Sequence, residues 1–251
     1  MNLTFGGKTI IVTGAASGIG AAIAEELAQS EATVIVADLK ADAAQAEVDK
    51  ITAAGGKALA FAGNVANVDD VQAMVDFAVE KTGSLYGLVN NAGIGGAAAP
   101  LGDYPLDSWK SVIDVNLNGV FYGMRFAIPA MKAAGGGSIV NIASVLGSVG
   151  IANSSAYVTT KHALLGMTKN AALEHAMDNI RVTAVGPAFI KTPLLDANLD
   201  DEAKAYLASQ HAFNRLGDPA EVAAMVVFLL SERASFVTGS YHLVDGAYAA
   251  R

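Results

Sequence analysis

Short apolar segments rich in Val and Ile alternate along the chain with longer, Ala-rich segments of helical period. This alternation is typical of βαβ units, in which a helix crosses over between two parallel strands. Strands are expected at 8–13, 33–37, 58–61, 86–90, 137–142, 180–185 and 241–244. Helices are expected at 18–30, 41–54, 68–82, 107–132, 155–176, 199–210 and 219–231. We therefore predict an α/β fold of the Rossmann type, doubly wound, with helices on both faces of a seven-stranded, mostly parallel sheet.

Length and composition favour one domain that spans 1–251. The chain is 53% hydrophobic and 16% charged, and no linker or repeat divides it. A net charge of −8 without any basic run leaves nothing to neutralise nucleic-acid phosphates or an anionic membrane, so neither partner is expected. The chain contains no cysteine, which excludes thiolate catalysis and fits a cytoplasmic protein.

A glycine-rich turn at 13–20 stands between the first expected strand and its helix. Glycines at 14, 18 and 20 permit a tight turn and a close backbone approach, and the free amides at a helix start point at an anion. The next strand ends in Asp38, about where a carboxylate meets a ribose. These two features together predict a dinucleotide site.

Asp38 favours NAD(H) over NADP(H) as the cofactor. A carboxylate accepts hydrogen bonds from the ribose hydroxyls and repels a 2′-phosphate. No Arg or Lys occupies 15–17, and Leu39 follows the acid where a cation would otherwise hold the phosphate. Lys40 is interpreted as a solvated side chain.

Tyr157 and Lys161 stand four residues apart, so they share a face if 155–176 is helical. A positive charge beside a phenol favours the phenolate and lowers its pKa toward neutrality, where acid and base catalysis is efficient. Ser144, thirteen residues before Tyr157, supplies a second hydroxyl that can hold a substrate oxygen. Taken alone, the spacing equally fits an exposed helix that carries a Tyr and a Lys.

With two further motifs, these residues resemble the short-chain dehydrogenase/reductase family over essentially the whole chain. The Thr-Gly-x-x-x-Gly-x-Gly turn, the Asn-Asn-Ala-Gly motif at 90–93, Asn116, Ser144 and the Tyr–Lys pair occur in the family's order. The resemblance is closest to bacterial NAD(H)-dependent secondary-alcohol dehydrogenases, also called carbonyl reductases. It is carried by the stretches 103–109, 144–157 and 238–246.

The resemblance implies roles for four catalytic residues. Tyr157 is the general acid in reduction and the general base in oxidation, and Lys161 lowers its pKa, binds the nicotinamide ribose and passes protons onward. Ser144 binds the substrate carbonyl, while Asn116, through its backbone in a distorted helix, holds a water that joins Lys161 to solvent. The implied reaction is stereoselective hydride transfer between NAD(H) and a secondary alcohol or prochiral ketone, with an R alcohol as the hypothesised product.

The resemblance also extends the cofactor site beyond the turn. The implied cofactor contacts are Gly14, Ser17, Gly18, Ile19, Gly20, Asp38, Leu39, Asn64, Val65, Asn91, Ala92, Gly93, Tyr157, Lys161, Pro187, Ala188, Ile190 and Thr192. Two residues depart from the family pattern, because Asn64 replaces the usual Asp and Ala188 stands where Gly is usual. If the backbone at Ala188 needs a positive φ, the alanine costs about 1 kcal/mol and the loop is expected to shift.

The segment 194–215 lies where the family places a substrate lid. Its apolar side chains suit an uncharged, hydrophobic ketone, or equally pack as helix core. The expected substrate contacts are Ser144, Leu146, Asn153, Tyr157, Gly186, Leu194 and Leu195. None of them is a cation, and the nearby Arg215 is expected to form a surface ion pair.

Alternatives remain open on the sequence. Within the family they are a 3-oxoacyl thioester reductase, whose acidic carrier protein needs a basic entrance, and a sugar dehydrogenase. Outside the enzymes, a nucleotide-sensing regulator has no need of the four catalytic residues together. The His and carboxylate residues show no metal spacing, so no metal is expected. A homotetramer is expected from the family, through the helices at 107–132 and 155–176 and the last strand.

Overall fold

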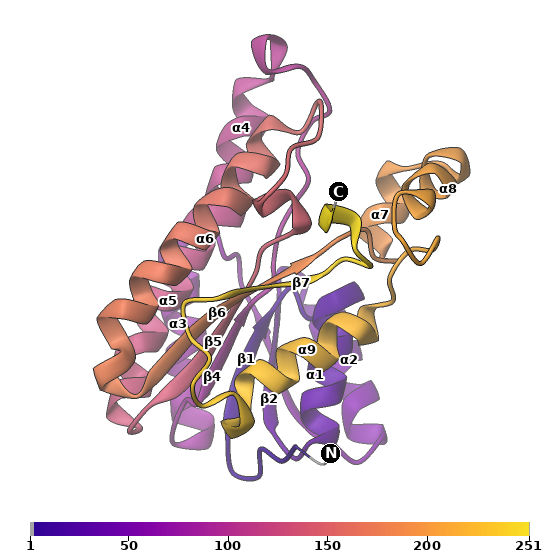
Figure 1. Ribbon diagram of the computed structural model, residues 1–251. Coiled ribbons are helices and arrows are strands. Elements are labelled where there is room, and N and C mark those ends of the chain that lie inside the picture. The colour runs from indigo at the N-terminus through magenta and orange to yellow at the C-terminus, as the bar shows by residue number, and fades with distance from the viewer. Residues whose placement is uncertain (1–2, 251) are drawn as a thin grey trace.

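The computed structural model describes residues 3–250. Its strands form one seven-stranded sheet (Figure 1). The strands are β1 (Thr9–Thr13), β2 (Thr33–Asp38), β3 (Lys57–Ala62), β4 (Gly87–Asn90), β5 (Gly137–Ile142), β6 (Ile180–Pro187) and β7 (Tyr241–Val244). Their order is β3-β2-β1-β4-β5-β6-β7, and every neighbouring pair is parallel. The predicted sheet is confirmed, and it is parallel throughout.

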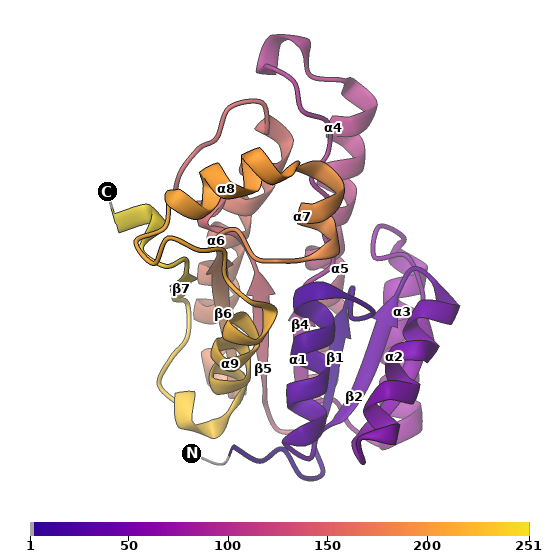
Figure 2. The same ribbon diagram turned by 90° about the vertical axis from the view of Figure 1, so that its right-hand side faces the viewer.

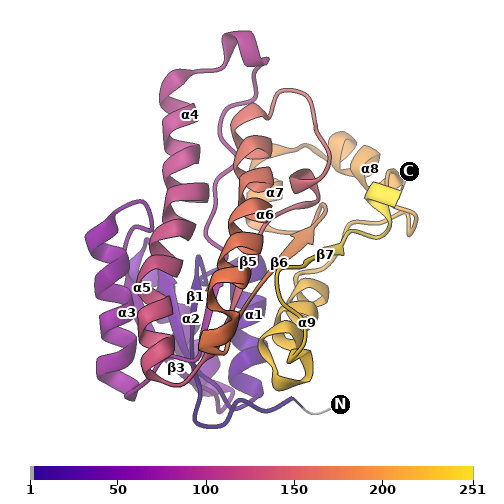
Figure 3. The ribbon, with the colours of Figure 1, turned by 60° about the vertical axis from the view of Figure 1, so that its left-hand side comes forward.

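Helices cover both faces of the sheet, as predicted (Figures 1 and 3). Helices α1, α2 and α9 pack on one face, and α3, α5 and α6 pack on the other. The helices are α1 (Gly18–Gln29), α2 (Ala41–Ala53), α3 (Val68–Thr82), α4 (Leu106–Ile113), α5 (Gly119–Ala133), α6 (Ser155–His175), α7 (Pro193–Asn198), α8 (Asp201–Ser209) and α9 (Pro219–Leu230). Within residues 3–250, no helix combines the length and apolar character that a membrane span requires.

The central strands are buried on both faces, which explains their continuous Val and Ile runs. Successive residues of β1 point in opposite directions, so Ile10 and Val12 join the core beneath α1 and α9 while Ile11 joins the core beneath α3 and α5. Leu27 and Met131 are fully buried on these two opposite sides. The sheet therefore packs between two apolar cores, one on each face.

The predicted helix at 107–132 is not continuous. A π-helical segment, η2 (Asp114–Asn118), separates α4 from α5, and the buried Asn116 lies at its centre. Such π segments often mark functional positions, because the extra residue disrupts the regular pattern of helical hydrogen bonds. This is the distorted helix that the family resemblance implies.

The predicted helix at 199–210 is α8, but the short helix α7 before it was not predicted. Thr192 is its N-cap, since the Thr192 hydroxyl oxygen accepts a hydrogen bond from the Leu195 amide, and Pro193 occupies its first turn. A Thr-Pro pair is a helix start signal, but the helix is only six residues long. Helices α7 and α8 lie above the carboxyl ends of the strands (Figure 2).

Candidate active site

A cavity of about 990 Å³ opens at the carboxyl ends of the strands. Ligands of doubly wound sheets bind at this edge, beside the point where the strand order reverses. Here the order reverses at β1, which lies between β2 and β4. The cavity is walled by the turn after β1, by the loops that follow β2 to β6, and by α7 and α8.

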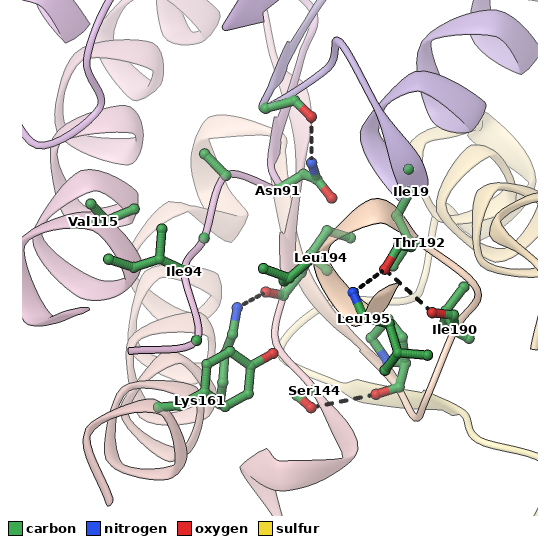
Figure 4. Close-up of a pocket in the computed structure, with 18 of the residues that line it drawn as sticks. Ile19, Asn91, Ile94, Val115, Ser144, Lys161, Ile190, Thr192, Leu194 and Leu195 are labelled. Carbon is green, nitrogen blue, oxygen red and sulfur yellow. Dashed lines mark hydrogen bonds between the residues drawn. The ribbon is translucent and has the colours of Figure 1, made fainter. Parts of the chain in front are cut away.

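The glycine turn forms one end of the cavity. Gly14 (φ +61°) and Gly18 (φ +57°) adopt left-handed backbone conformations that glycine adopts without strain. A Cβ on Gly20 would overlap the carbonyl oxygen of Gly14, so this position also requires glycine. The Asn91 amide donates to the carbonyl oxygens of Thr13 at 2.9 Å and Gly14 at 3.0 Å (Figure 4), which holds the turn in place.

The start of α1 faces this end of the cavity with polar groups. Ser17 is the N-cap of α1 but makes no side-chain capping bond, which leaves the first helix amides available to an anion. The Asp38 carboxylate, at the end of β2, accepts hydrogen bonds from the amides of Ala16 at 3.1 Å and Lys40 at 3.4 Å. Asp38 and Leu39 line the cavity, whereas the Lys40 side chain is exposed and does not, in agreement with its interpretation as solvated.

The other expected cofactor residues come together along the same cavity. Every expected cofactor contact lines the cavity except Gly20, which packs against the Gly14 carbonyl oxygen. Besides the residues of the glycine turn, Asp38 and Leu39, the lining contacts are Asn64, Val65, Asn91, Ala92, Gly93, Tyr157, Lys161, Pro187, Ala188, Ile190 and Thr192. Ala188 is not among the residues with positive φ, and its amide donates to the Val244 carbonyl oxygen at 3.1 Å. The alanine therefore fits this loop without backbone strain.

Tyr157 and Lys161 share one face of α6, as their spacing predicts. The Lys161 Nζ lies 5.4 Å from the centre of the Tyr157 ring. The ammonium is buried, with the residue only 4% exposed, and donates to the Ile142 carbonyl oxygen at 2.7 Å (Figure 4). Burial disfavours the charged form and lowers the pKa of Lys161 from 10.5 to about 8. The lysine is thus held at the end of β5 with a proton that it can release near neutral pH.

The expected lowering of the Tyr157 pKa is wrong for the structure described. Burial raises the pKa of Tyr157 above its usual value, because the phenolate loses contact with water, and a hydrogen bond with the Ser144 hydroxyl only partly opposes this effect. The phenol is therefore protonated at neutral pH. It is a competent proton donor, and its conversion to a base depends on a nearby cation.

Ser144 lies just after β5 and faces the same space as Tyr157. Its hydroxyl oxygen accepts a hydrogen bond from the Leu146 amide at 3.2 Å, and the hydroxyl donates weakly to the Pro187 carbonyl oxygen at 3.5 Å (Figure 4). Ser144 is only 7% exposed. The serine hydroxyl is thereby directed toward the gap between β5 and the loop after β6.

The Asn116 side chain has a contact that the sequence did not reveal. Its Oδ1 accepts from the Ile94 amide at 2.8 Å, and its Nδ2 donates to the Ile94 carbonyl oxygen at 2.9 Å. This reciprocal pair ties the π segment to the loop after β4, which lines the cavity beside Lys161. The Asn116 amide therefore shapes the site, in addition to the backbone role implied by the family.

The substrate end of the cavity is apolar. Among the residues expected to contact the substrate, five line it: Ser144, Leu146, Tyr157, Leu194 and Leu195. Further apolar lining residues were missed because they come from loops and the π segment without a motif; they are Ile94, Val115, Val145 and Ile151. Figure 4 shows Ile94 and Val115 on the opposite side from Leu194 and Leu195.

Two residues expected to contact the substrate lie outside the cavity lining. Asn153 does not line the cavity; it adopts φ +64° in the loop before α6, and its carbonyl oxygen accepts from the Ala99 amide. Gly186 does not line it either, because the Tyr241 ring occupies the space beside it. Arg215 pairs with Glu221 at 2.6 and 2.8 Å, the surface ion pair that was expected.

Charged groups are sparse in the cavity. Its charged lining residues, within the described chain, are Asp38 and Asp70 at the glycine-turn end and Lys161 beside Tyr157. Across residues 3–250, no group of three or more His, Asp or Glu side chains is placed to hold a metal ion.

Comparisons with known proteins agree with this geometry. A family model described as enoyl-(acyl carrier protein) reductase, which belongs to the short-chain dehydrogenase/reductases, matches residues 14–249. The cyclohexanol dehydrogenase of Acinetobacter sp. (strain SE19) is 49% identical over 251 residues, covering 100% of this chain and 98% of the relative. The cis-4-hydroxycyclohexanecarboxylate dehydrogenase of Sinomonas cyclohexanicum is 42% identical over 250 residues and 100% of both chains.

A solved structure extends the likeness to three dimensions. A 7α-hydroxysteroid dehydrogenase, complexed with NADH and 7-oxo glycochenodeoxycholic acid, matches with a TM-score of 0.93 at 35% identity, over 98% of this chain and 95% of that chain. The fold, the matched family model and the full-length relatives all point the same way. The chain belongs to the short-chain dehydrogenase/reductase family and is an oxidoreductase of that family.

Proposed function

We propose that the protein transfers a hydride reversibly between NAD(H) and an uncharged secondary alcohol or its prochiral ketone. One observation carries this proposal. Ser144, Tyr157 and Lys161 line an apolar end of the cavity whose other end is the glycine turn and Asp38. We call the place where the two ends meet, at Ser144, Tyr157 and Lys161, the junction. Its hydroxyl, phenol and buried ammonium are the groups needed to exchange a proton with a substrate oxygen. A bound cofactor would exchange a hydride with the adjacent carbon.

The residues present fit a nicotinamide dinucleotide. The left-handed Gly14 and Gly18 leave the backbone bare where a pyrophosphate approaches, and the open α1 amides would bind it. Asp38 would accept the ribose hydroxyls, and Thr192 and Ile190 would border the nicotinamide. When bound, the cofactor supplies or accepts the hydride.

Tyr157 would act as the acid in reduction. Because burial raises its pKa, the phenol holds its proton at neutral pH and can donate it to a substrate oxygen. The phenolate that remains is stabilised by the Lys161 ammonium on the same helix face. In oxidation the same pair would work in reverse, with the phenolate taking the alcohol proton.

Ser144 would hold the substrate oxygen beside the Tyr157 phenol. Asn116 would keep the loop at Ile94 against the π segment, and with it the wall of the cavity next to Lys161. These two residues would position the reactants rather than exchange protons with them.

The lining favours an alicyclic or aryl ketone without a charged group. The substrate end carries mainly aliphatic side chains, and its one cation among residues 3–250, Lys161, is buried and bonded to the Ile142 carbonyl oxygen rather than placed to pair a carboxylate or phosphate. Relatives named for cyclohexanol and for a hydroxycyclohexanecarboxylate support a six-membered ring as substrate, and the aliphatic lining favours the uncharged ring. We extend the hypothesis of an R product to acetophenone, where chiral analysis of the alcohol tests it.

Helices α7 and α8 would serve as the substrate lid. Leu194 and Leu195 of α7 and Tyr206 of α8 line the cavity, as does Leu199 between the two helices. A homotetramer in the cytoplasm is proposed on the family resemblance, and light scattering coupled to gel filtration tests the assembly.

A substrate and cofactor panel tests the proposal. NADH or NADPH oxidation is followed with cyclohexanone, acetophenone, 4-oxocyclohexanecarboxylate, a 3-oxoacyl thioester and a keto sugar. We expect the highest kcat/KM for cyclohexanone or acetophenone with NADH. A higher value for the thioester or the sugar would replace the proposal with one of the alternatives, and equal values with both cofactors would refute the NAD preference.

A further inference from the structure

Tyr241 bonds directly to the main chain of Ser144. Its hydroxyl, on β7, donates to the Ser144 carbonyl oxygen at 2.5 Å, although 97 residues separate the two. Ser144 follows β5, and β6 lies between β5 and β7 in the sheet. The tyrosine side chain therefore crosses over an entire strand to reach the residue beyond it.

Gly186 makes this crossing possible. In the β6–β7 register, Ala184 pairs with Tyr241 and Gly186 with Leu243, so Gly186 lies on the same face of the sheet as Tyr241. A Cβ on Gly186 would overlap the Tyr241 ring and hydroxyl. The glycine is thus needed for the tyrosine rather than for a substrate, which explains why it does not line the cavity.

The Ser144 carbonyl oxygen has two donors. Besides Tyr241, the Gly147 amide donates to it at 2.8 Å and closes the short helix η3 (Val145–Gly147), for which Ser144 is the N-cap. Ser144 is in an extended conformation there, and its hydroxyl oxygen accepts from the Leu146 amide. Fixing the carbonyl from both sides fixes the peptide, and with it the direction of the hydroxyl.

The Tyr241 hydroxyl is suited to act as a permanent donor. Burial raises the pKa of Tyr241 above its usual value, and the nearby Asp245 and Tyr157 add to this effect while the Ser148 hydroxyl opposes it. The phenol therefore stays protonated at neutral pH. Tyr157, one of the reacting groups, is close enough to influence the pKa of Tyr241.

We propose that Tyr241 is a positioning residue for the reaction, which holds the main chain of Ser144 so that the serine hydroxyl meets the substrate oxygen beside Tyr157. The inference rests on the proposed function of Ser144. Within the described chain, neither Tyr241 nor Gly186 lines the cavity, so Tyr241 acts through Ser144 and not by touching the substrate.

A double-mutant cycle between Tyr241→Phe and Ser144→Ala tests this coupling. Cyclohexanone reduction is measured with saturating NADH, together with the KM for NADH and the thermal midpoint of each variant. We expect Tyr241→Phe to lower kcat about tenfold with the KM for NADH unchanged, because a partial misplacement of the Ser144 hydroxyl should cost less than the roughly 10²-fold of a 1 Å displacement. We expect Ser144→Ala to lower kcat about 10²- to 10³-fold, and the double variant to be no slower than Ser144→Ala alone.

Tyr86 offers a matched control. Its hydroxyl also donates to a main-chain carbonyl oxygen, that of Leu230, at 2.8 Å, but far from the cavity. Tyr86→Phe should leave kcat unchanged and should combine additively with Ser144→Ala. Gly186→Ala, which pushes the tyrosine ring aside without removing its hydroxyl, should reproduce the kcat loss of Tyr241→Phe.

The outcomes separate the inference from the function on which it rests. A wild-type kcat in Tyr241→Phe would overturn the inference, and so would a loss that multiplies with that of Ser144→Ala in the double variant. A Ser144→Ala variant with wild-type kcat would overturn the role of Ser144 in the proposed function together with the inference. A loss in Tyr241→Phe that disappears in the Ser144→Ala background supports both.

Discussion

The two ends of the cavity are built in different ways. The glycine-turn end consists of main chain at the tips of buried strands, where Thr13 Oγ1 accepts from the amides of Asn91 and Ala92 at 3.0 and 3.1 Å. The substrate end consists of apolar side chains, many of them on the short helices α7 and α8. There Leu194 is 49% exposed and Tyr206 is 64% exposed.

This difference teaches which properties the fold determines and which the side chains determine. A turn made by backbone conformation binds the same pyrophosphate whatever the nearby side chains are. A pocket made by side chains changes its ligand when a few of them change. We therefore expect substitutions at the junction to abolish turnover, those at the glycine-turn end to change the cofactor, and those at the substrate end to change the substrate.

The largest effect is expected at the junction, from Tyr157→Phe. The variant keeps the ring but loses the proton donor, so kcat for cyclohexanone should fall by about 10³- to 10⁴-fold. NADH affinity, measured by fluorescence titration, should stay within about twofold because the glycine-turn end is untouched. Retention of a tenth or more of the wild-type kcat would show that another group supplies the proton.

At the glycine-turn end, Asp38→Ala combined with Leu39→Arg should reverse the cofactor preference. Loss of the carboxylate removes charge-assisted hydrogen bonds worth about 1.5–3 kcal/mol, so kcat/KM for NADH should fall about 10- to 100-fold. The new guanidinium should raise kcat/KM for NADPH, because it pairs with the 2′-phosphate. Relative activities across the ketone panel should not change. A changed ketone order would mean that the two ends are not separable.

The junction should also show a pH dependence set by Lys161. Its pKa is lowered from 10.5 to about 8, so the ammonium that stabilises the Tyr157 phenolate is lost as the pH rises through about 8. The rate of ketone reduction should therefore fall by about tenfold for each unit above that pH. Lys161→Arg, which keeps its charge, should retain some activity and lose this decline; a wild-type profile that is flat to pH 10 would contradict the assignment.

The lowered pKa of Lys161 also predicts how the free energy of unfolding changes with pH. Between pH 8 and 10.5 the unfolded chain still binds the lysine proton that the folded chain has released, so the contribution of Lys161 to stability increases with pH in that window. Lys161→Met should remove this contribution, which urea unfolding at two pH values in the window can measure.

The smallest effect is expected at the substrate end. Leu195→Lys places a cation where the cavity has aliphatic walls, and it should raise kcat/KM for 4-oxocyclohexanecarboxylate relative to cyclohexanone by about tenfold. Leu195→Met, a volume-conserving control, should leave that ratio unchanged. If Leu195→Lys leaves this kcat/KM ratio unchanged, the substrate ring does not bind next to α7.

Most of the fold and the glycine-turn end could be predicted from the sequence. Buried parallel strands require runs of Val and Ile, and a turn such as Gly14–Gly20 requires glycine at fixed spacing. Both patterns can therefore be recognised in the sequence. The same holds for Tyr157 and Lys161, whose spacing places them on one helix face.

The rest depends on contacts between distant segments. Gly186 was expected to line the pocket, but its role is set by Tyr241, a residue on another strand. Asn153 was expected there too, but its carbonyl oxygen accepts from the Ala99 amide, and the neighbouring Ile151 lines the cavity instead. The direction of the Tyr157 pKa also failed as a prediction, because burial is a property of the folded chain and spacing does not report it.

The most direct test of the proposed function is isotope transfer. The protein is incubated with NADH that carries deuterium at both C4 positions and with cyclohexanone, and the cyclohexanol is analysed by mass spectrometry. We expect one deuterium at the carbinol carbon with the wild type, and none above background with Tyr157→Phe over the same time. Cyclohexanol without deuterium, or equal labelling by the Tyr157→Phe variant, would contradict hydride transfer in this cavity with Tyr157 as the acid.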